Sequence, residues 1–303
     1  MSYLALWMLA YAYCGDRAPY TGRRRLLFYS DRAERQKGEE IKQQLLSRYR
    51  LLPRDSPYTL SVQRVGRRLA DVVEKEIYGL AVEKGTQVEY ERYDWEFFVL
   101  DSGEVNAMVA PGGKVFVHRG MLDLIASPRP LLGGRVYKME VDRDELAAVI
   151  GHEAGHVVAR HMSERVAYEL VTHLVTLAMA LVVDSYELSN MITHFAMRLT
   201  STREQEREAD IIGLELLTKA CYDPRAAGRV FAKLERMEQH QGLSSVPEFM
   251  RTHPLSESRR ADLQSREGDA IDKWKANPRC VQVRRQLHDS FSAGAPPSRR
   301  STM

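Results

Sequence analysis

The segment 145–161, ELAAVIGHEAGHVVARH, contains two histidines four residues apart, with a glutamate directly after the first. If this segment is an α-helix, the imidazoles of His152 and His156 project from nearly the same face and can reach one metal ion. The carboxylate of Glu153 then lies beside the ion, where it can take a proton from a water molecule. This HExxH pattern is typical of zinc sites that hydrolyse peptide bonds, in which two histidines are ligands and the glutamate is the general base.

A catalytic zinc ion normally has three protein ligands and one open position, so the pattern requires a further ligand. His161 lies five residues after His156, which rotates it about 140° around a continuous helix and away from the other two imidazoles. The metzincin spacing is also absent, because Ala159 and Met162 stand where that pattern has glycine and histidine. We therefore expect the third ligand to come from another element.

The segment 201–210, STREQEREAD, is the best source of that ligand. Glu206 and Asp210 are four residues apart and share one face of a helix, whereas the two other glutamates of the segment face elsewhere. The apolar residues that follow predict a buried helix, in which carboxylates need partners. Glu206 would complete a set of two imidazoles and one carboxylate, and Asp210 would accept the remaining ring N–H of a ligating histidine, which we expect to be His152.

Small residues inside the HExxH motif indicate that another element packs closely against it. Ala154 and Gly155 stand between the two histidines. Glycine costs a helix about 1 kcal/mol relative to alanine, so its presence here suggests a close approach rather than a plain packing helix.

The surrounding elements predict a mainly helical α+β fold with a small sheet beside the active-site helix. Apolar residues at helical spacing from Val62 to Ile77 predict an amphipathic helix, and the charged residues 31–50 predict an exposed one. The chain from Asp144, the expected helix cap, is mainly helical. Segments rich in β-branched and aromatic residues predict three strands, at 93–100, 105–110 and 114–118, the last two joined as a hairpin by residues 111–113. Residues 126–143 contain SPRP and GG and are expected to form an irregular surface loop.

Composition excludes several other classes of protein. The 44 basic residues nearly balance the 41 acidic ones, and the net charge of +3 is too small to indicate nucleic-acid binding. The three cysteines, Cys14, Cys221 and Cys280, are far apart and form no CxxC pair, which argues against a disulfide framework or a cysteine zinc site. A reducing compartment or inert thiols are expected instead.

Three segments leave membrane contact open. The first residues, MSYLALWMLAYAYCG, are apolar but shorter than a span of about 20 residues, and they lack the basic start of a signal peptide. They fit the remnant of a membrane or interfacial helix, or a buried or truncated N-terminus. Residues 170–183 predict a short buried helix, with a helix that dips into a membrane face as the alternative. The basic segment 20–30 fits either a solvated turn or an anionic membrane surface.

Several motifs together resemble one peptidase family. HEAGH (152–156) followed by EREAD (206–210) resembles the gluzincin family that includes the HtpX heat-shock peptidases and the CAAX prenyl proteases. VNAMVAPGG (105–113) resembles the family's strand beside the active-site cleft, and FMRTHPLSESR (249–259) resembles the segment whose histidine approaches the zinc ion. YTGRRRLLFYS (20–30) resembles the signature of the mitochondrial Oma-type branch, which acts at the inner membrane.

The resemblance implies a zincin-like peptidase domain that holds one zinc ion per chain. Glu206 is then the third ligand, and Asp210 lies behind a ligating histidine. His253 is implied to approach the zinc ion, either as a hydrogen-bond donor to the developing oxyanion or as the occupant of the open zinc position at rest. Asn106 and Ala107 are implied to present backbone groups that bind substrate as an added strand.

The motifs and the resemblance predict a zinc metalloendopeptidase that hydrolyses protein or peptide substrates, membrane proteins in particular, in quality control or stress processing at the mitochondrial inner membrane. We expect a membrane-proximal or truncated segment at 1–30, a peptidase domain at 31–285 and a disordered tail at 286–303. Contact with a membrane surface and assembly into a homo-oligomer stay open, and nucleic acid is not an expected partner. The alternative function is a zinc-binding, membrane-associated chaperone or scaffold with little proteolysis, whose site is closed by His253.

Overall fold

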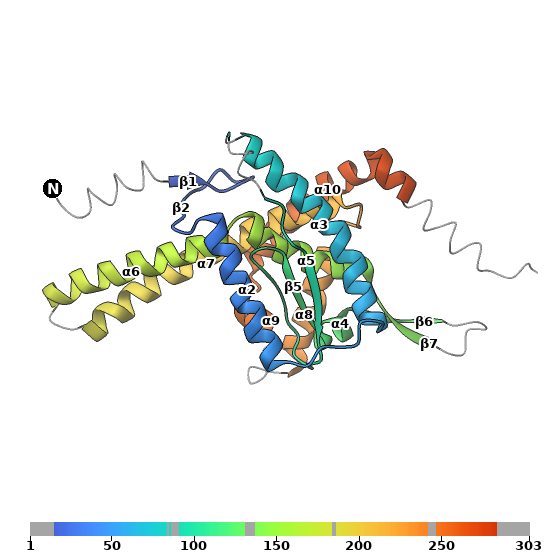
Figure 1. Ribbon diagram of the computed structural model, residues 1–303, viewed down its shortest axis with the longest axis horizontal. Coiled ribbons are helices and arrows are strands. Elements are labelled where there is room, and N and C mark those ends of the chain that lie inside the picture. The colour runs from blue at the N-terminus through green and yellow to red at the C-terminus, as the bar shows by residue number, and fades with distance from the viewer. Residues whose placement is uncertain are drawn as a thin grey trace, which may run out of the picture.

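Helices make up most of the chain and surround a small mixed sheet, as Figure 1 shows. The computed structural model describes residues 15–83, 85, 91–130, 137–183, 186–241 and 247–283. Predictions for the apolar N-terminus and for the tail after residue 285 lie outside these residues. The expected mainly helical α+β fold with a small sheet is confirmed.

The helix that carries the HExxH motif, α5 (Arg143–Val158), lies in the middle of the structure (Figure 1). Its N-cap is Asp142, whose side chain accepts from the backbone N–H groups of Asp144 and Glu145 at 3.0 Å each. The predicted cap at Asp144 is therefore wrong by two residues. Asp144 instead accepts a hydrogen bond from the N–H of Asp223 at 3.0 Å.

Two long helices follow and run side by side, projecting together from the body in Figure 1. They are α6 (His161–Val183) and α7 (Tyr186–Lys219). The chain turns sharply between α5 and α6 because Arg160 adopts a left-handed backbone conformation with φ 55°. The C-terminal part of α7 returns to the core, where it packs along α5 more extensively than any other pair of elements.

The contact between α5 and α7 depends on small residues. A Cβ added to Gly155 would lie 2.8 Å from the backbone oxygen of Ala209, closer than real Cβ atoms come. Gly213 likewise lies against the backbone of His152. The close approach predicted from Gly155 is therefore present, and the neighbouring element is α7.

The sheet beside α5 has three strands in the order β3-β5-β4. These are β3 (Glu96–Leu100), β4 (Ala107–Ala110) and β5 (Lys114–His118). β4 and β5 pair antiparallel, which confirms the predicted hairpin, and β3 pairs with β5 in parallel. β4 thus lies at one edge of the sheet, and it packs against α5.

Helices cover both faces of this sheet. α2 (Asp31–Arg48) packs Ile41 and Leu45 against the buried Phe116 on one face. α3 (Pro57–Glu83) and α5 contribute to the main core on the other face, which contains Val115 and Val117. The alternation along β5 follows from the two-residue period of a strand.

The remaining elements complete the body. Residues 126–143, predicted as an irregular loop, contain an antiparallel ribbon of β6 (Ala126–Pro130) and β7 (Tyr137–Val141), so that prediction is wrong. Both strands of a two-stranded ribbon are edges, where proline is tolerated. Further helices are α4 (Arg119–Ile125), α8 (Ala226–Gln241), α9 (Glu248–Thr252) and α10 (Glu257–Ala276).

An N-terminal hairpin of β1 (Gly15–Arg17) and β2 (Arg24–Leu26) packs against α6. Two of its arginines do not form a solvated turn, because Arg25 is 2% exposed and Arg23 pairs with the buried carboxylates of Glu164 and Glu208. The hairpin is therefore joined to the two long helices by partly buried ion pairs.

The apolar half of α6 is not simply buried. Leu170, Leu174 and Leu177 are 50%, 60% and 58% exposed, so the prediction of a buried helix is wrong for these three side chains. Their spacing of four and three residues places them on one stripe of the helix. Within the described residues, no helix combines the length and the apolar character needed to cross a bilayer.

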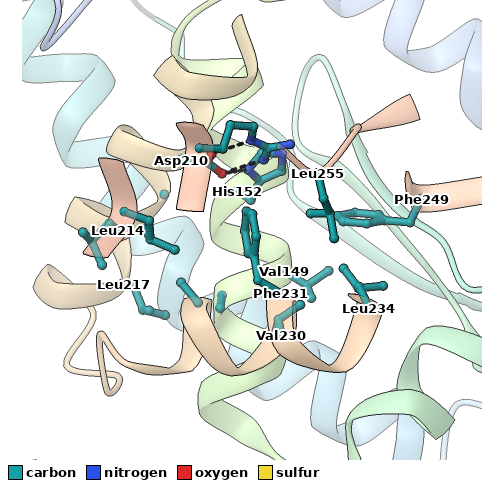
Figure 2. Close-up of a pocket in the computed structure, with 15 residues that line it drawn as sticks. Val149, His152, Asp210, Leu214, Leu217, Val230, Phe231, Leu234, Phe249 and Leu255 are labelled. Atoms are coloured by element: carbon teal, nitrogen blue, oxygen red, sulfur yellow. Dashed lines mark hydrogen bonds and ion pairs between the residues drawn. The ribbon is translucent and has the colours of Figure 1, made fainter. Parts of the chain in front are cut away.

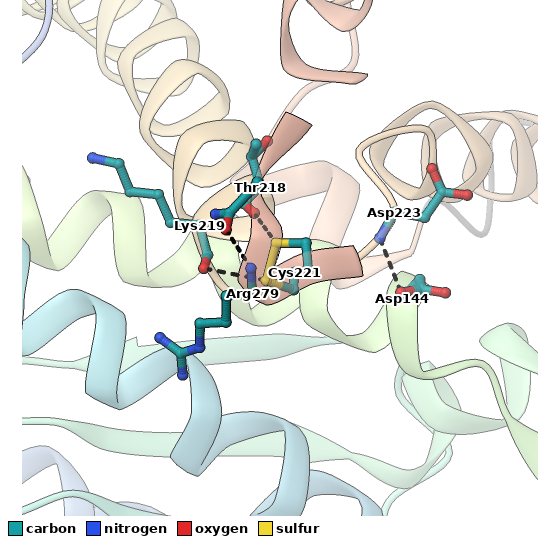
Figure 3. The surroundings of a disulfide bond; sticks show 8 residues. Asp144, Thr218, Lys219, Cys221, Asp223 and Arg279 are labelled. Carbon is teal, nitrogen blue, oxygen red and sulfur yellow. Dashed lines mark hydrogen bonds between the residues drawn. A yellow bond between two sulfur atoms is a disulfide. The ribbon is translucent and has the colours of Figure 1, made fainter. Parts of the chain in front are cut away.

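A disulfide joins Cys221 and Cys280, which corrects the expectation of free thiols (Figure 3). The two cysteines are 59 residues apart, and the bond ties the end of α7 to the helical residues 278–283. In the chain-entropy model, closing a loop of this length stabilises the fold by about 4 kcal/mol. Figure 3 also shows the bond from Asp223 to Asp144 that holds the same region to the start of α5.

The close approach of α5 and α7 makes Gly155→Ala destabilising. The added methyl group meets backbone that cannot rotate away, and we expect a loss of about 1–3 kcal/mol in the free energy of unfolding. The matched control is Gly268→Ala in α10, where nothing lies within 4 Å and a gain of up to about 1 kcal/mol is expected. Urea unfolding measures both variants, and a Gly155→Ala protein as stable as the original would contradict the packing described.

Candidate metal centre and active site

Four side chains from three separate segments meet at the face of α5. His152 and His156 come from α5, Glu206 from α7, and His253 from the turn after α9. One ligand atom from each lies within 4.8 Å of the other three. Three residues of the expected metal site are therefore together, and the histidine implied to approach the metal lies with them.

The distances within this cluster are short. Nε2 of His152 lies 3.3 Å from Nε2 of His156 and 3.3 Å from Oε2 of Glu206. Nδ1 of His253 lies 2.9 Å from the same carboxylate oxygen and 3.3 Å from Nε2 of His152. Ring nitrogens of two imidazoles and the oxygens of one carboxylate thus converge on one point, which suits a divalent cation.

Glu153 borders the cluster without belonging to it. It is buried, and its Oε1 lies 3.3 Å from Nε2 of His253 but makes no hydrogen bond with the described residues. Burial raises the pKa of this carboxyl, although His253 and His152 oppose that shift. A carboxylate with a raised pKa and an unused oxygen is suited to accept a proton.

The outer nitrogen of His152 is held by a carboxylate and an arginine. Its Nδ1 lies 2.9 Å from Oδ1 of Asp210, and Arg259 donates to the two oxygens of Asp210 at 2.7 and 2.8 Å. Figure 2 shows His152 and Asp210 side by side above an apolar cavity. The volume of this cavity is about 30 Å³, and α8 forms part of its lining. The apolar wall keeps water from these bonds, which strengthens them.

The outer nitrogen of His156 is held differently. Its Nδ1 lies 2.8 Å from Nδ1 of His161, whose Nε2 lies 3.0 Å from Oε2 of Glu208. The helix geometry that turned His161 away does not apply, because α5 ends at Val158 and the left-handed Arg160 redirects the chain. His161 is nevertheless outside the four-residue cluster.

The electrostatics of the cluster favour a positive charge at its centre. Burial alone lowers the pKa of His152, but the hydrogen bonds to Asp210 and Glu206 overcome it and raise this pKa to about 10. Burial alone would raise the pKa of Glu206, but contacts with His152, His156 and His253 outweigh burial and hold this pKa far below its usual range. Burial keeps the pKa of His156 well below its ordinary value, so its imidazole is neutral, as a metal ligand requires.

A cavity of about 270 Å³ opens beside the cluster. Its lining combines Glu153, His156 and His253 with Asn106 and Ala107. β4 borders this cavity at the edge of the sheet, so all the predicted substrate-binding and catalytic residues lie around one space.

Two residues at the site make contacts that the sequence patterns did not predict. Arg259 belongs to the segment 249–259 but had no role, and Glu208 was expected only to face away from Glu206. Glu208 does face away, yet it is 1% exposed and contacts His161 and Arg23. The available signal was the run of arginines at 23–25, of which Arg23 has its partners far along the chain.

Two histidines one helical turn apart, an adjacent glutamate and a carboxylate from a second helix define a metallopeptidase. Comparison with known proteins agrees: a family model described as Peptidase family M48 matches residues 67–267. The mitochondrial metalloendopeptidase OMA1 of Schizosaccharomyces pombe is 33% identical, over 91% of this chain and 70% of that protein. OMA1 of Saccharomyces cerevisiae is 26% identical over 86% of this chain and 70% of its own length. The β-barrel assembly-enhancing protease of Escherichia coli K12 is 27% identical over 57% of this chain and 34% of its own length.

The chain belongs to peptidase family M48 and is an Oma-type metalloendopeptidase. The resemblance read from the motifs is therefore confirmed. Nothing in the comparisons favours the alternative of a scaffold with little proteolysis.

Asp210→Asn tests the support of His152. The amide keeps the shape but removes the negative charge that Arg259 and His152 share, and loss of such a partner typically lowers metal affinity about 10–100-fold. Competition against a chelating indicator measures this affinity. The control is Asp262→Asn, which removes an arginine-paired carboxylate on α10 that is not a member of the four-residue cluster and should leave metal binding unchanged. Equal affinity in the two variants would contradict the role of Asp210.

Proposed function

We propose that the chain hydrolyses internal peptide bonds of protein substrates with one zinc ion held by His152, His156 and Glu206. The convergence of these three side chains carries the proposal, because two imidazoles and one carboxylate form a ligand set typical of catalytic zinc. When bound, zinc supplies a Lewis acid that polarises the substrate carbonyl and lowers the pKa of water. The protein residues then orient the substrate and move protons.

In this proposal Glu153 is the general base. Its unused oxygen and raised pKa suit it to accept the proton of the attacking water and later to pass a proton to the leaving amine. Asp210 would fix the ring of His152 through Nδ1, so that Nε2 faces the cluster and exchanges its proton for the metal ion.

His253 is proposed to occupy the fourth position at rest. Its Nδ1 lies among the candidate ligand atoms, 2.9 Å from Glu206, where substrate must approach. It sits in a short turn before Pro254 rather than on α5 or α7, so it can move without disturbing the other ligands. Substrate binding would then displace His253 and open the site.

The substrate is proposed to lie along the edge of β4. Asn106 accepts a hydrogen bond from the N–H of His118 on β5 at 3.0 Å. Because antiparallel residues alternate, Ala107 and Val109 direct their backbone groups to the free edge, whereas Asn106 and Met108 direct theirs to β5. The N–H of Ala107 is occupied by the side chain of Asn106 at 2.9 Å, so we propose that Asn106 releases this group when a substrate strand binds.

The proposed location is the mitochondrial inner membrane. Two relatives are named mitochondrial metalloendopeptidases, which supports the mitochondrion as the compartment. The exposed stripe of Leu170, Leu174 and Leu177 supports contact with a membrane surface and hence access to membrane proteins as substrates. Assembly into a homo-oligomer stays a prediction.

The variant Glu153→Gln tests whether Glu153 acts as the general base without being a metal ligand. We expect turnover of a peptide substrate to fall about 10²–10⁴-fold, because the amide cannot accept the proton, while about one zinc per chain is retained. Metal analysis and peptide hydrolysis are measured on the same preparation. The paired variant Glu206→Ala should lose zinc as well as activity, and retained turnover in Glu153→Gln would sink the assignment of the base.

His253→Ala distinguishes the two roles considered for this histidine. If His253 fills the fourth position at rest, its removal should weaken zinc binding and raise kcat/KM severalfold when zinc is saturating. A fall in kcat with unchanged zinc affinity would instead show that His253 stabilises the oxyanion, and would contradict the resting-state role. Titration with zinc followed by steady-state kinetics provides both quantities.

A further inference from the structure

A line of side chains, buried in its middle, joins the candidate ligand His156 to the N-terminal hairpin. From His156, the contacts run through His161 to Glu208 at 2.8 and 3.0 Å. Arg23 then donates to both oxygens of Glu208, from Nε at 2.9 Å and from Nη2 at 2.7 Å. The hairpin thus reaches a candidate metal ligand through two intervening residues.

This line is built as an interior feature rather than a surface contact. His161, Glu164 and Glu208 are each at most 1% exposed, and Arg23 bridges the two carboxylates. Thr21 in the same hairpin also donates to Glu208. Two buried carboxylates this close need a shared cation, and the guanidinium of Arg23 supplies it.

By distance alone, His161, Glu164 and Glu208 could also hold a metal ion. The guanidinium of Arg23 already pairs with both carboxylates, with Nη2 at 2.8 Å from Glu164. A second metal ion would have to displace Arg23 and separate it from all its carboxylate partners. The arrangement therefore favours a fixed network over a second metal site.

The ion pair of Arg23 and Glu208 at one end of the line fixes the direction of the hydrogen bonds along it. Paired with Arg23, Glu208 is an acceptor, so Nε2 of His161 carries a proton and Nδ1 of His161 has a free lone pair. That lone pair accepts the proton on Nδ1 of His156. Nε2 of His156, which faces the cluster, is then left with its lone pair available to a metal ion.

We propose that Arg23 and Glu208 act through His161 as positioning residues that set the ring orientation and tautomer of His156, which makes the N-terminal hairpin part of the metal site. This inference rests on the proposed function, in which His156 is a metal ligand. It differs from the support of His152, because the arginine comes from a hairpin more than a hundred residues before the motif. Removal of such a support is expected to lower metal affinity about 10–100-fold.

The test compares two replacements of His161 in the full chain. His161→Gln keeps an acceptor and a donor on one planar amide, whereas His161→Leu has neither. We expect Leu to lower the affinity for Zn²⁺ about 10–100-fold and Gln to restore most of it. Affinity is measured by competition with a chelating indicator, and the visible absorption of the Co²⁺-loaded protein reports whether the coordination geometry changes.

A second pair of variants tests the hairpin. Arg23→Met removes the charge from the network and should weaken Zn²⁺ binding and alter the Co²⁺ spectrum. Arg17→Met is the matched control, because Arg17 is an exposed arginine of the same hairpin whose Nη1 donates to the oxygen of Gly22. Circular dichroism checks that each variant folds, and the His161 pair still decides the question if Arg23→Met does not.

The outcomes separate this inference from the proposed function. If His156→Ala loses Zn²⁺ but His161→Leu binds it like the original protein, the positioning role is overturned and the metal site stands. Equal losses in His161→Gln and His161→Leu would show that His161 acts by packing alone, which also overturns the inference. If His156→Ala itself retains Zn²⁺ affinity, the proposed ligand set fails first.

Discussion

The close packing of α5 against α7 is the constraint on which the site depends. α5 alone offers two imidazoles and a base, and the third candidate ligand arrives only because Glu206 lies where α7 crosses it. Gly155 permits this crossing, since any Cβ there would meet the backbone of Ala209. A residue chosen for helix propensity would favour α5 in isolation but would separate the two halves of the site.

Charge balance explains why the site extends beyond its ligands. α7 directs Glu206 to the cluster, Asp210 to His152 and Glu208 to His161, and burying three carboxylates on one helix is costly without partners. Histidines and two arginines offset this cost, and a divalent cation at the cluster would offset it further. Each carboxylate that supports a histidine has its own arginine, Arg259 for Asp210 and Arg23 for Glu208.

Features set by short-range spacing could be predicted from the sequence, and features set by distant partners could not. The helical face of His152 and His156, the β4–β5 hairpin and the close approach at Gly155 all follow from local periodicity or from glycine. The disulfide between Cys221 and Cys280 was missed because their spacing says nothing about which cysteines meet in space. The direction of the His161 side chain was predicted wrongly, because the prediction assumed a continuous helix. One residue in the left-handed conformation, Arg160, ends that helix, and no glycine or proline marks its end in the sequence.

The side chains that hold the outer ring nitrogens of His152 and His156 come from different parts of the fold. The support of His152 comes from Asp210 and Arg259, which are inside the segment matched by the family model, whereas the support of His156 ends at Arg23, before that segment begins. If this line positions His156 for metal binding, then metal binding and docking of the hairpin are linked by one coupling free energy. Linkage then requires the effect to be reciprocal: whatever displaces the hairpin weakens the metal site, and bound metal holds the hairpin in place by the same amount. Arg23 of the basic segment would therefore serve the active site through buried carboxylates, rather than a membrane surface from outside the protein.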